Sequence, residues 1–197
     1  MRKKNTRNTK GKIVTAAWRL FYEQGYDDTT VDDIVYESGT SKGSFYHYFS
    51  GKDALLSSLS YLFDEKYEEL QDTFPPEMTC VEKLIFLNQE VFRMIENSVS
   101  IDLLAQLLSS QLVTKSEKHL LDHNRTYYKL LRSVILEGQR EGELKRDVSV
   151  NEIVKAYAMF ERALMYDWCL CNGEYSLCGY SAQMLPLFLA GFSEKNL

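Results

Sequence analysis

Residues 40–52 concentrate hydroxyl, amine and phenol groups that can bind phosphate and read the edges of base pairs. Phe45 and Phe49 are four residues apart, so on a helix they lie on one side, where we expect them to pack into a core. Gly43 has no side chain and would let DNA approach closely. The residues expected on the opposite side, or at the N-terminal end that meets base edges, are Lys42, Gly43, Ser44, Tyr46 and His47.

A second constellation consists of His119 and His123, which are four residues apart with Asp122 between them. On a helix this spacing places two imidazoles on one face, as a metal site requires. No third ligand is evident, so we favour two exposed histidines near the start of a helix and expect no metal.

Three cysteines near the C-terminus, Cys169, Cys171 and Cys178, could form a redox or soft-metal sensor. Cys169 and Cys171 straddle the expected end of a helix, and single cysteines serve well as small buried hydrophobic residues. We therefore favour reduced, structural thiols.

Glu161 lies in an apolar neighbourhood beside Tyr157, Leu164, Met165 and Trp168. A buried carboxylate without a partner would cost about 2 kcal/mol or more, unless a cation or an arginine meets it. The favoured interpretation is an ion pair at the surface with Arg162 or with a neighbouring helix.

The sequence contains no glycine-rich phosphate loop, no nucleophile elbow of the G-x-S-x-G kind and no zincin motif. A nucleophile, a base and an orienting group cannot be assembled at any convincing spacing, so an all-α enzyme is the least supported hypothesis. We expect a protein that is not an enzyme and needs no cofactor.

The elements that must position these side chains are predicted to be helical. Only three prolines and ten glycines occur in 197 residues, and apolar positions repeat with helical spacing. Gly25 is expected to end the first helix. The apolar stripe of that helix comprises Ile13, Ala16, Ala17, Leu20 and Phe21.

Two short helices with a tight glycine turn follow. Thr30 is placed to cap a helix over residues 31–38, and Gly39 can take the left-handed conformation that ends it. Ser41 can cap a third helix over residues 42–49. This order of elements predicts a helix-turn-helix.

Residues 29–56 read TTVDDIVYESGTSKGSFYHYFSGKDALL, and together with the first helix they closely resemble the DNA-binding signature of the TetR family over about residues 10–56. The resemblance implies an all-α fold of about nine helices with a helix-turn-helix head. It also implies DNA contacts from Thr30, Thr40, Ser41, Lys42, Gly43, Ser44, Tyr46, His47, Tyr48 and Lys52. The chain departs from the commoner pattern at Val31, which offers no hydroxyl, and at His47-Tyr48, where an aromatic residue followed by His is often found.

Charge is distributed unevenly along the chain. The net charge is −5, yet residues 1–52 hold nine Lys and Arg against six acidic residues, whereas the remainder holds fourteen against twenty-two. A basic end on an acidic body suits a protein that touches phosphate at one end. The basic arm before Lys12 would lie along the DNA backbone or in the minor groove, or else serve as a solubilising tail.

Residues 1–52 are therefore expected to form a DNA-binding domain with a basic N-terminal arm, and residues 53–197 a ligand-binding and dimerisation domain. A linking helix is predicted over residues 52–72. Further helices are predicted at about 79–97, 100–113, 116–141, 149–171 and 180–193. No apolar run is long enough to cross a membrane, so we expect a cytoplasmic protein with no membrane partner.

The resemblance further implies a helical cavity for a small inducer of unknown identity. Aromatic stripes at helical spacing are more often plain core than ligand contacts. The candidate wall residues are Phe86, Phe92, Leu103, Leu107, Tyr127, Tyr128, Phe160, Glu161, Met165 and Trp168.

The last two helices carry more apolar surface than a monomer needs, which favours a homodimer. One stripe comprises Ile153, Ala156, Tyr157, Phe160, Leu164 and Trp168, and the other Met184, Leu185, Leu187, Phe188 and Phe192. A dimer also supplies the two half-sites that a palindromic operator requires.

The favoured functional hypothesis is a ligand-responsive repressor that a small molecule releases from its double-stranded DNA operator. The alternative keeps the DNA-binding head but makes the body an architectural or accessory platform for another protein. A cavity with polar anchors would favour the first hypothesis, and a filled core with an exposed apolar groove the second.

Overall fold

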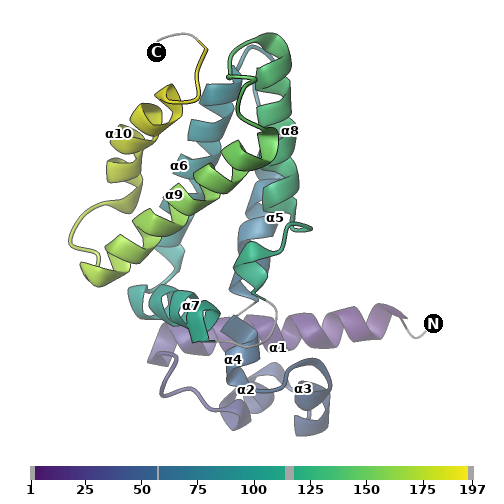
Figure 1. Ribbon diagram of the computed structural model, residues 1–197. Coiled ribbons are helices and arrows are strands. Elements are labelled where there is room, and N and C mark those ends of the chain that lie inside the picture. Colours follow the sequence, from purple (N-terminus) through teal and green to yellow (C-terminus); the bar gives the residue numbers. More distant parts are fainter. Residues whose placement is uncertain (1–2, 57, 114–117, 195–197) are drawn as a thin grey trace. The chain divides into compact units, whose positions relative to one another are not determined.

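The computed structural model describes residues 3–56, 58–113 and 118–194, and in these residues the regular structure is helical (Figure 1). The only bridge among them pairs Leu144 with Ser193. The helices are α1 (Lys3–Gln24), α2 (Val31–Ser38), α3 (Lys42–Tyr48), α4 (Lys52–Leu56), α5 (Leu59–Gln71), α6 (Cys80–Ser98), α7 (Ile101–Val113), the short 3-10 helix η1 (His119–Leu121), α8 (Thr126–Glu141), α9 (Val150–Leu170) and α10 (Leu177–Ala190). The all-α fold expected from the sequence is confirmed.

The chain forms two compact units, and the first comprises residues 1–61 and 99–119. In this unit α1 packs on α2 and α3, and α4 packs on α7. The predicted stripe of α1 is buried from Ile13 to Phe21, and Ile34 and Phe45 contribute the facing side chains, both with no exposed surface. This first unit, which we call the head, therefore has its own hydrophobic core. The core determines which side of α3 faces outward.

The second unit comprises residues 62–98 and 120–197, and α6 lies at its centre. α6 packs against α10 on one side and α8 on another, and α9 contacts both α8 and α10. The close approach of α6 and α8 depends on Gly138, because a Cβ there would lie 2.7 Å from the Cβ of Cys80. This helical body holds most of the candidate ligand-binding residues.

Helix boundaries differ from the predictions at three places, one of which is the last helix, expected over residues 180–193 and found at Leu177–Ala190. The helix expected over residues 52–72 is divided into α4 and α5, and Ser58 between them donates a hydrogen bond to the carbonyl of Leu55. The helix expected over residues 116–141 begins only at Thr126. Before it, η1 and a turn closed by the Asp122 side chain occupy the chain.

The N-terminal residues also differ from the expected arm. α1 begins at Lys3, so the basic segment is helical from that residue onward. None of the described helices is long and apolar enough to cross a membrane.

Candidate DNA-binding surface and ligand-binding body

The helix-turn-helix is held by local capping interactions that the sequence predicted. Thr30 and Asp33 form a reciprocal capping box at the start of α2, and Gly39 ends that helix with a φ of +61°. The Ser41 side chain then caps α3 by accepting a hydrogen bond from the backbone N–H of Ser44 at 3.1 Å. These interactions set the turn between the two helices without any tertiary partner.

α3 has a buried side and an exposed side, as the aromatic spacing predicted. Phe45 and Phe49 are buried, with ring centroids 5.8 Å apart, which confirms their scaffold role. Tyr46 and His47 are exposed, and Tyr48 is half-buried. The outward side of α3 thus presents a phenol and an imidazole to solvent.

Gly43 lies near the first turn of α3, where the surface is open. A Cβ added there would meet only the Oγ of Ser41, at 3.9 Å. The fold therefore does not require glycine at this position. An absent side chain on an open recognition surface is what close approach of a partner needs.

Both lysines of the expected interface have partners within the head. Lys42 forms an ion pair with Asp32 at 2.7 Å, with both side chains largely exposed, and this contact raises the pKa of Lys42. Lys52 donates to the carbonyl of Tyr26 at 2.7 Å and lies over its ring. Asp32 thus holds the Lys42 ammonium beside the exposed face, whereas Lys52 also anchors the turn after α1.

The two expected threonines serve the local structure. Thr30 caps α2, and the Thr40 hydroxyl lies 2.8 Å from that of Ser38 in the turn. Sequence reasoning passed over Tyr36, whose ring is 88% exposed on α2. A fully exposed aromatic side chain beside the turn is a further candidate contact, and its position opposite buried Ile34 was the available signal.

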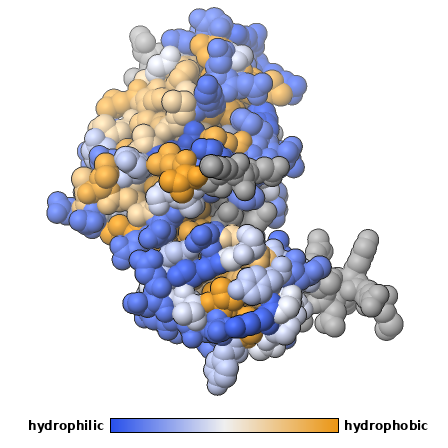
Figure 2. Space-filling view, turned by 60° about the horizontal axis from the view of Figure 1, so that its bottom comes forward, coloured by the Kyte–Doolittle hydropathy of each residue, from blue (hydrophilic) through white to orange (hydrophobic). Residues whose placement is uncertain are grey.

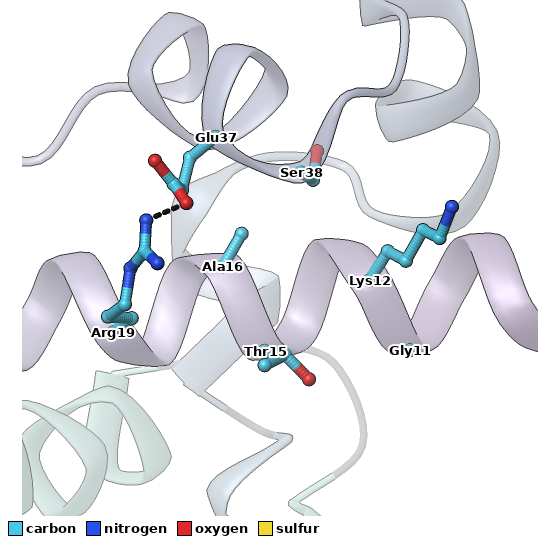
Figure 3. A pocket seen from close by; sticks show the side chains of 7 residues that line it. All are labelled: Gly11, Lys12, Thr15, Ala16, Arg19, Glu37 and Ser38. Atoms are coloured by element: carbon cyan, nitrogen blue, oxygen red, sulfur yellow. Dashed lines mark ion pairs between the residues drawn. The ribbon is translucent and has the colours of Figure 1, made fainter.

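A groove of about 450 Å³ lies between α1 and α2 on the head (Figure 3). Arg19 crosses it to form an ion pair with Glu37, while Lys12 and Thr15 lie on the α1 side and Ser38 on the α2 side. Two basic side chains line the groove, Arg19 and Lys12. Arg19 is paired with Glu37, whereas Lys12 forms no ion pair with the described residues.

In the body, Glu161 is 3% exposed, so the expectation of an ion pair at the surface is wrong. One carboxyl oxygen accepts a hydrogen bond from the Asn88 amide at 2.8 Å, and the other accepts from the Tyr127 hydroxyl at 2.6 Å. Arg162 instead donates to the Tyr128 hydroxyl. Neutral donors that the sequence pattern did not associate with Glu161 replace the expected cation.

Burial and hydrogen bonding act on Glu161 in opposite directions. Removal from water raises the pKa of its carboxyl group, while the hydrogen bonds donated by Tyr127 and Asn88 lower it. The net direction is upward because desolvation is the larger effect. The group therefore holds a proton more tightly than an exposed glutamate does.

The candidate wall residues divide between the two units. Leu103 and Leu107 are buried in the first unit, on α7, and the other eight belong to the second. Within the second unit the structure brings together Tyr127 and Glu161, and Tyr127 also contacts the Tyr128 ring at 4.9 Å. Phe92 and Trp168 are buried, whereas Phe86, Phe160 and Met165 are half-buried.

Two polar residues in the same interior, Asn88 and Ser181, were missed from the sequence. Ser181 on α10 donates to the Oδ1 of Asn88, and the Tyr157 hydroxyl donates to the carbonyl of Leu84 at 2.8 Å. Asn88 and Ser181 have no exposed surface. The available signal was a polar residue at an apolar position of a helical stripe, since Asn88 follows buried Leu87 and precedes buried Val91.

A buried ion pair joins α5 to the start of α8. Asp64 accepts from the Nε of Arg125 at 2.8 Å and from its NH2 group at 3.2 Å. The backbone N–H of Tyr127 also donates to Asp64. The residue whose hydroxyl meets Glu161 is therefore also bonded to α5 through its backbone.

Among the described residues, the histidines and cysteines do not come together in a metal-binding site. His119 lies in η1 and His123 in the following turn, so the helical spacing inferred for them is wrong. The described residues contain no group of three potential metal ligands. Burial raises the pKa of Cys169 to about 11, which opposes formation of the reactive thiolate.

Comparison with known proteins gives matches along most of the chain. Residues 13–59 match the model described as bacterial regulatory proteins of the tetR family, and residues 61–191 match the C-terminal region of YsiA-like proteins. The chain is 24% identical over 188 residues to the fatty acid metabolism regulator protein of Bacillus subtilis, covering 93% of this chain and 95% of that protein.

Two solved structures show the same fold. FadR from Bacillus subtilis in complex with stearoyl-CoA has a TM-score of 0.70 at 23% identity, covering 92% of this chain and 98% of that chain. FadR from Thermus thermophilus in complex with lauroyl-CoA has a TM-score of 0.72 at 22% identity, covering 92% and 93%. Each of these two structures has a small molecule bound.

Proposed function

This chain belongs to the TetR family of bacterial regulatory proteins, and from that membership we propose that it is a homodimeric repressor released from a palindromic operator by a small molecule. The observation that carries the proposal is the exposed side of α3, capped by Ser41 and backed by buried Phe45. Residues 1–52 are proposed as the DNA-binding domain and residues 53–197 as the effector-binding and dimerisation domain.

The outward face of α3 supplies both kinds of DNA contact in this proposal. Ser44 and Tyr46 are placed for base edges and sugar-phosphate groups, while Lys42 is placed for a phosphate. The Lys42 ammonium would exchange Asp32 for DNA, and the resulting release of counterions would make operator binding depend steeply on salt.

The proposed dimer surface differs from the stripe expected from the sequence. Ile153, Tyr157, Leu164 and Trp168 are buried within the body and are therefore closed to a partner. The exposed apolar residues of α9 are instead Met159, Tyr166 and Leu170. On α10, Leu187 of the expected stripe is exposed, as is Tyr180, whereas Leu185 of that stripe is buried. Hydrophobic side chains gather on the left of the body in Figure 2, the side on which Figure 1 places α10.

The effector in this proposal binds the helical body and shifts the two recognition helices out of register with the DNA grooves. Its identity is open to direct test. Stearoyl-CoA and lauroyl-CoA are the first compounds to try, because two solved relatives are described as complexes with them.

The test is fluorescence anisotropy on DNA from upstream of the protein's own gene, across a series of salt concentrations. We expect a specific complex that weakens steeply with salt, and a loss of affinity of about tenfold or more in Lys42→Ala and in Tyr46→Ala. Lys129→Ala is the matched control, since Lys129 is an exposed lysine of α8. Equal, weak binding by all four proteins would overturn the assignment.

A further inference from the structure

Asp32 and Lys42 form an ion pair that joins the two helices of the helix-turn-helix beside the exposed face of α3. The carboxylate and the ammonium group lie 2.7 Å apart, and the side chains remain 66% and 63% exposed. The hydrogen bond to Asp32 and the charge of its carboxylate raise the pKa of Lys42. The cation placed for a DNA phosphate is therefore already bound to a carboxylate of the same chain.

The local structure of α2 depends on Asp33 rather than on Asp32. Asp33 forms the capping box, because its carboxylate accepts hydrogen bonds from the backbone N–H and the hydroxyl of Thr30. Ile34 is the buried residue of α2, and Asp32, two residues earlier, lies on nearly the opposite side of the helix. An exposed ion pair contributes little to stability. The Asp32 carboxylate therefore acts mainly on whatever approaches Lys42.

A DNA phosphate and the Asp32 carboxylate compete for the same ammonium group. Binding of Lys42 to a phosphate weakens the internal ion pair. It also brings the Asp32 carboxylate close to the negatively charged DNA backbone, which repels it. Both effects oppose binding. Because phosphate contacts carry no sequence information, the opposition is the same on operator DNA and on other DNA.

We propose that Asp32 is an intramolecular competitor of DNA phosphate, which acts through Lys42 to limit the affinity of the protein for double-stranded DNA of any sequence. This inference rests on the proposed function and adds a regulatory contact to its DNA-binding surface. In the proposed dimer the contact occurs twice. A restraint of about threefold at each protomer, the size expected of an exposed ion pair, becomes about tenfold for the dimer.

This restraint bears on release of the protein by an effector. An effector removes the protein from DNA only by as much as it favours the DNA-free conformation over the bound one. A lower affinity for DNA therefore lowers the coupling that the effector must supply. Asp32 makes the proposed complex easier to dissociate without altering which sequence is bound.

The experiment measures binding of the full chain to two duplexes of equal length by fluorescence anisotropy across a salt series. One duplex comes from upstream of the protein's own gene, and the other has the same bases in scrambled order. We expect Asp32→Asn to bind both duplexes about tenfold more tightly than the wild type at low salt. The salt dependence should steepen by about one counterion per protomer, since the Asp32 carboxylate no longer retains a cation beside the DNA.

Two further variants separate a competitor from a general effect of charge. Glu37→Gln is the matched control, because it also removes a charge and an ion pair from α2, but its partner is Arg19 of α1 rather than a residue of α3 (Figure 3). It should gain about threefold at most. The gain from Asp32→Asn should likewise fall to about threefold or less when Lys42→Ala is also present. Thermal unfolding of each variant reports folding separately.

The outcomes separate this inference from the function on which it rests. Equal gains in Asp32→Asn and Glu37→Gln would reduce the effect to net charge and overturn the inference, as would a gain that persists in full without Lys42. A loss of operator affinity in Asp32→Asn, with no change on the scrambled duplex, would make Asp32 a reader of bases and would overturn it too. If the wild type does not distinguish the two duplexes, the repressor assignment fails, while binding to the scrambled duplex still decides the role of Asp32.

Discussion

At the scale of single residues, the recognition surface depends on what Gly43 leaves empty. A Cβ at this position has room, since its nearest neighbour would be the Ser41 Oγ at 3.9 Å. Gly43→Ala should therefore leave the fold intact or stabilise it by up to about 1 kcal/mol through helix propensity. The added methyl group would nevertheless stand between α3 and the DNA, and we expect operator affinity to fall about tenfold.

Urea unfolding and anisotropy measured on the same preparation separate these two effects. Gly11→Ala is the control, because Gly11 lies in α1 and a Cβ there meets nothing within 4 Å. It should also stabilise the protein by up to about 1 kcal/mol through helix propensity, but it should leave operator affinity unchanged. Unchanged operator affinity in Gly43→Ala would show that DNA does not approach this face of α3.

The burial of Glu161 predicts that the free energy of unfolding depends on pH. Its pKa is raised in the fold above the ordinary value of 4.5, so the folded state binds the proton more tightly than the unfolded state. The stability linked to this proton is present at low pH and is lost as pH rises through the raised pKa. The groups that act on the Glu161 carboxyl group are Asn88 on α6, Tyr127 on α8, and Tyr157 and Arg162 on α9, and the charge of Glu161 in turn acts on Tyr67 of α5.

Glu161→Gln removes this titration. The free energy of unfolding of the variant, relative to that of the wild type, should therefore rise between pH 5 and pH 8. Urea unfolding at both pH values measures the difference, and Glu65→Gln, at an exposed glutamate of α5, serves as the control. A difference that stays constant between the two pH values would show that Glu161 titrates at an ordinary pKa.

At the scale of elements, the contact between α6 and α8 leaves no room for a side chain at Gly138. A Cβ at Gly138 would meet both the Sγ and the Cβ of Cys80, and would lie 3.2 Å from Leu144. Gly138→Ala should lower the free energy of unfolding by about 1–3 kcal/mol, since packed helices resist an added methyl group.

A double-mutant cycle assigns that cost to the named contact. Cys80→Gly removes both atoms that the methyl group would strike, and as the first residue of α6 it bears little helix penalty. The double variant should be more stable than the sum of the single changes by about 1 kcal/mol or more. Strict additivity in urea unfolding would place the strain elsewhere.

The elements differ in how far local sequence determined them. Thr30, Gly39 and Ser41 define α2 and α3 through contacts within four residues, so these helices were predictable with their ends. The late start of α8 was not, because Arg125 lies at its N-cap and is held by Asp64, sixty-one residues earlier. Periodicity carries no information about such a distant ion pair.

The same distinction applies to the candidate sites. The exposed face of α3 followed from the spacing of Phe45 and Phe49 alone. The burial of Glu161 depends on donors from two other helices, Asn88 on α6 and Tyr127 on α8. A charged residue beside a charged neighbour looks like a surface pair in sequence, and only the tertiary partners show otherwise.

At the scale of the whole molecule, the proposed function requires two copies of the chain, and the exposed apolar surface of α9 and α10 is the proposed contact between them. Met159, Tyr166 and Leu170 fall seven and four residues apart on α9, and Tyr180 and Leu187 are seven apart on α10. This spacing places each set along one side of its helix. Two such helices from each protomer would form a four-helix contact about a twofold axis.

Leu187→Glu should therefore separate the dimer, because it places a charge in an apolar contact. The contact is twofold, so each protomer contributes one such charge. Leu112→Glu is the matched control, since Leu112 on α7 is also 69% exposed but lies outside the proposed contact. Sedimentation equilibrium should give a dimer for the wild type and Leu112→Glu and a monomer for Leu187→Glu. Operator affinity should fall by a hundredfold or more in the monomer, because one half-site replaces two. A dimer that survives Leu187→Glu would place the twofold contact on another surface and leave this apolar face free for a different partner protein.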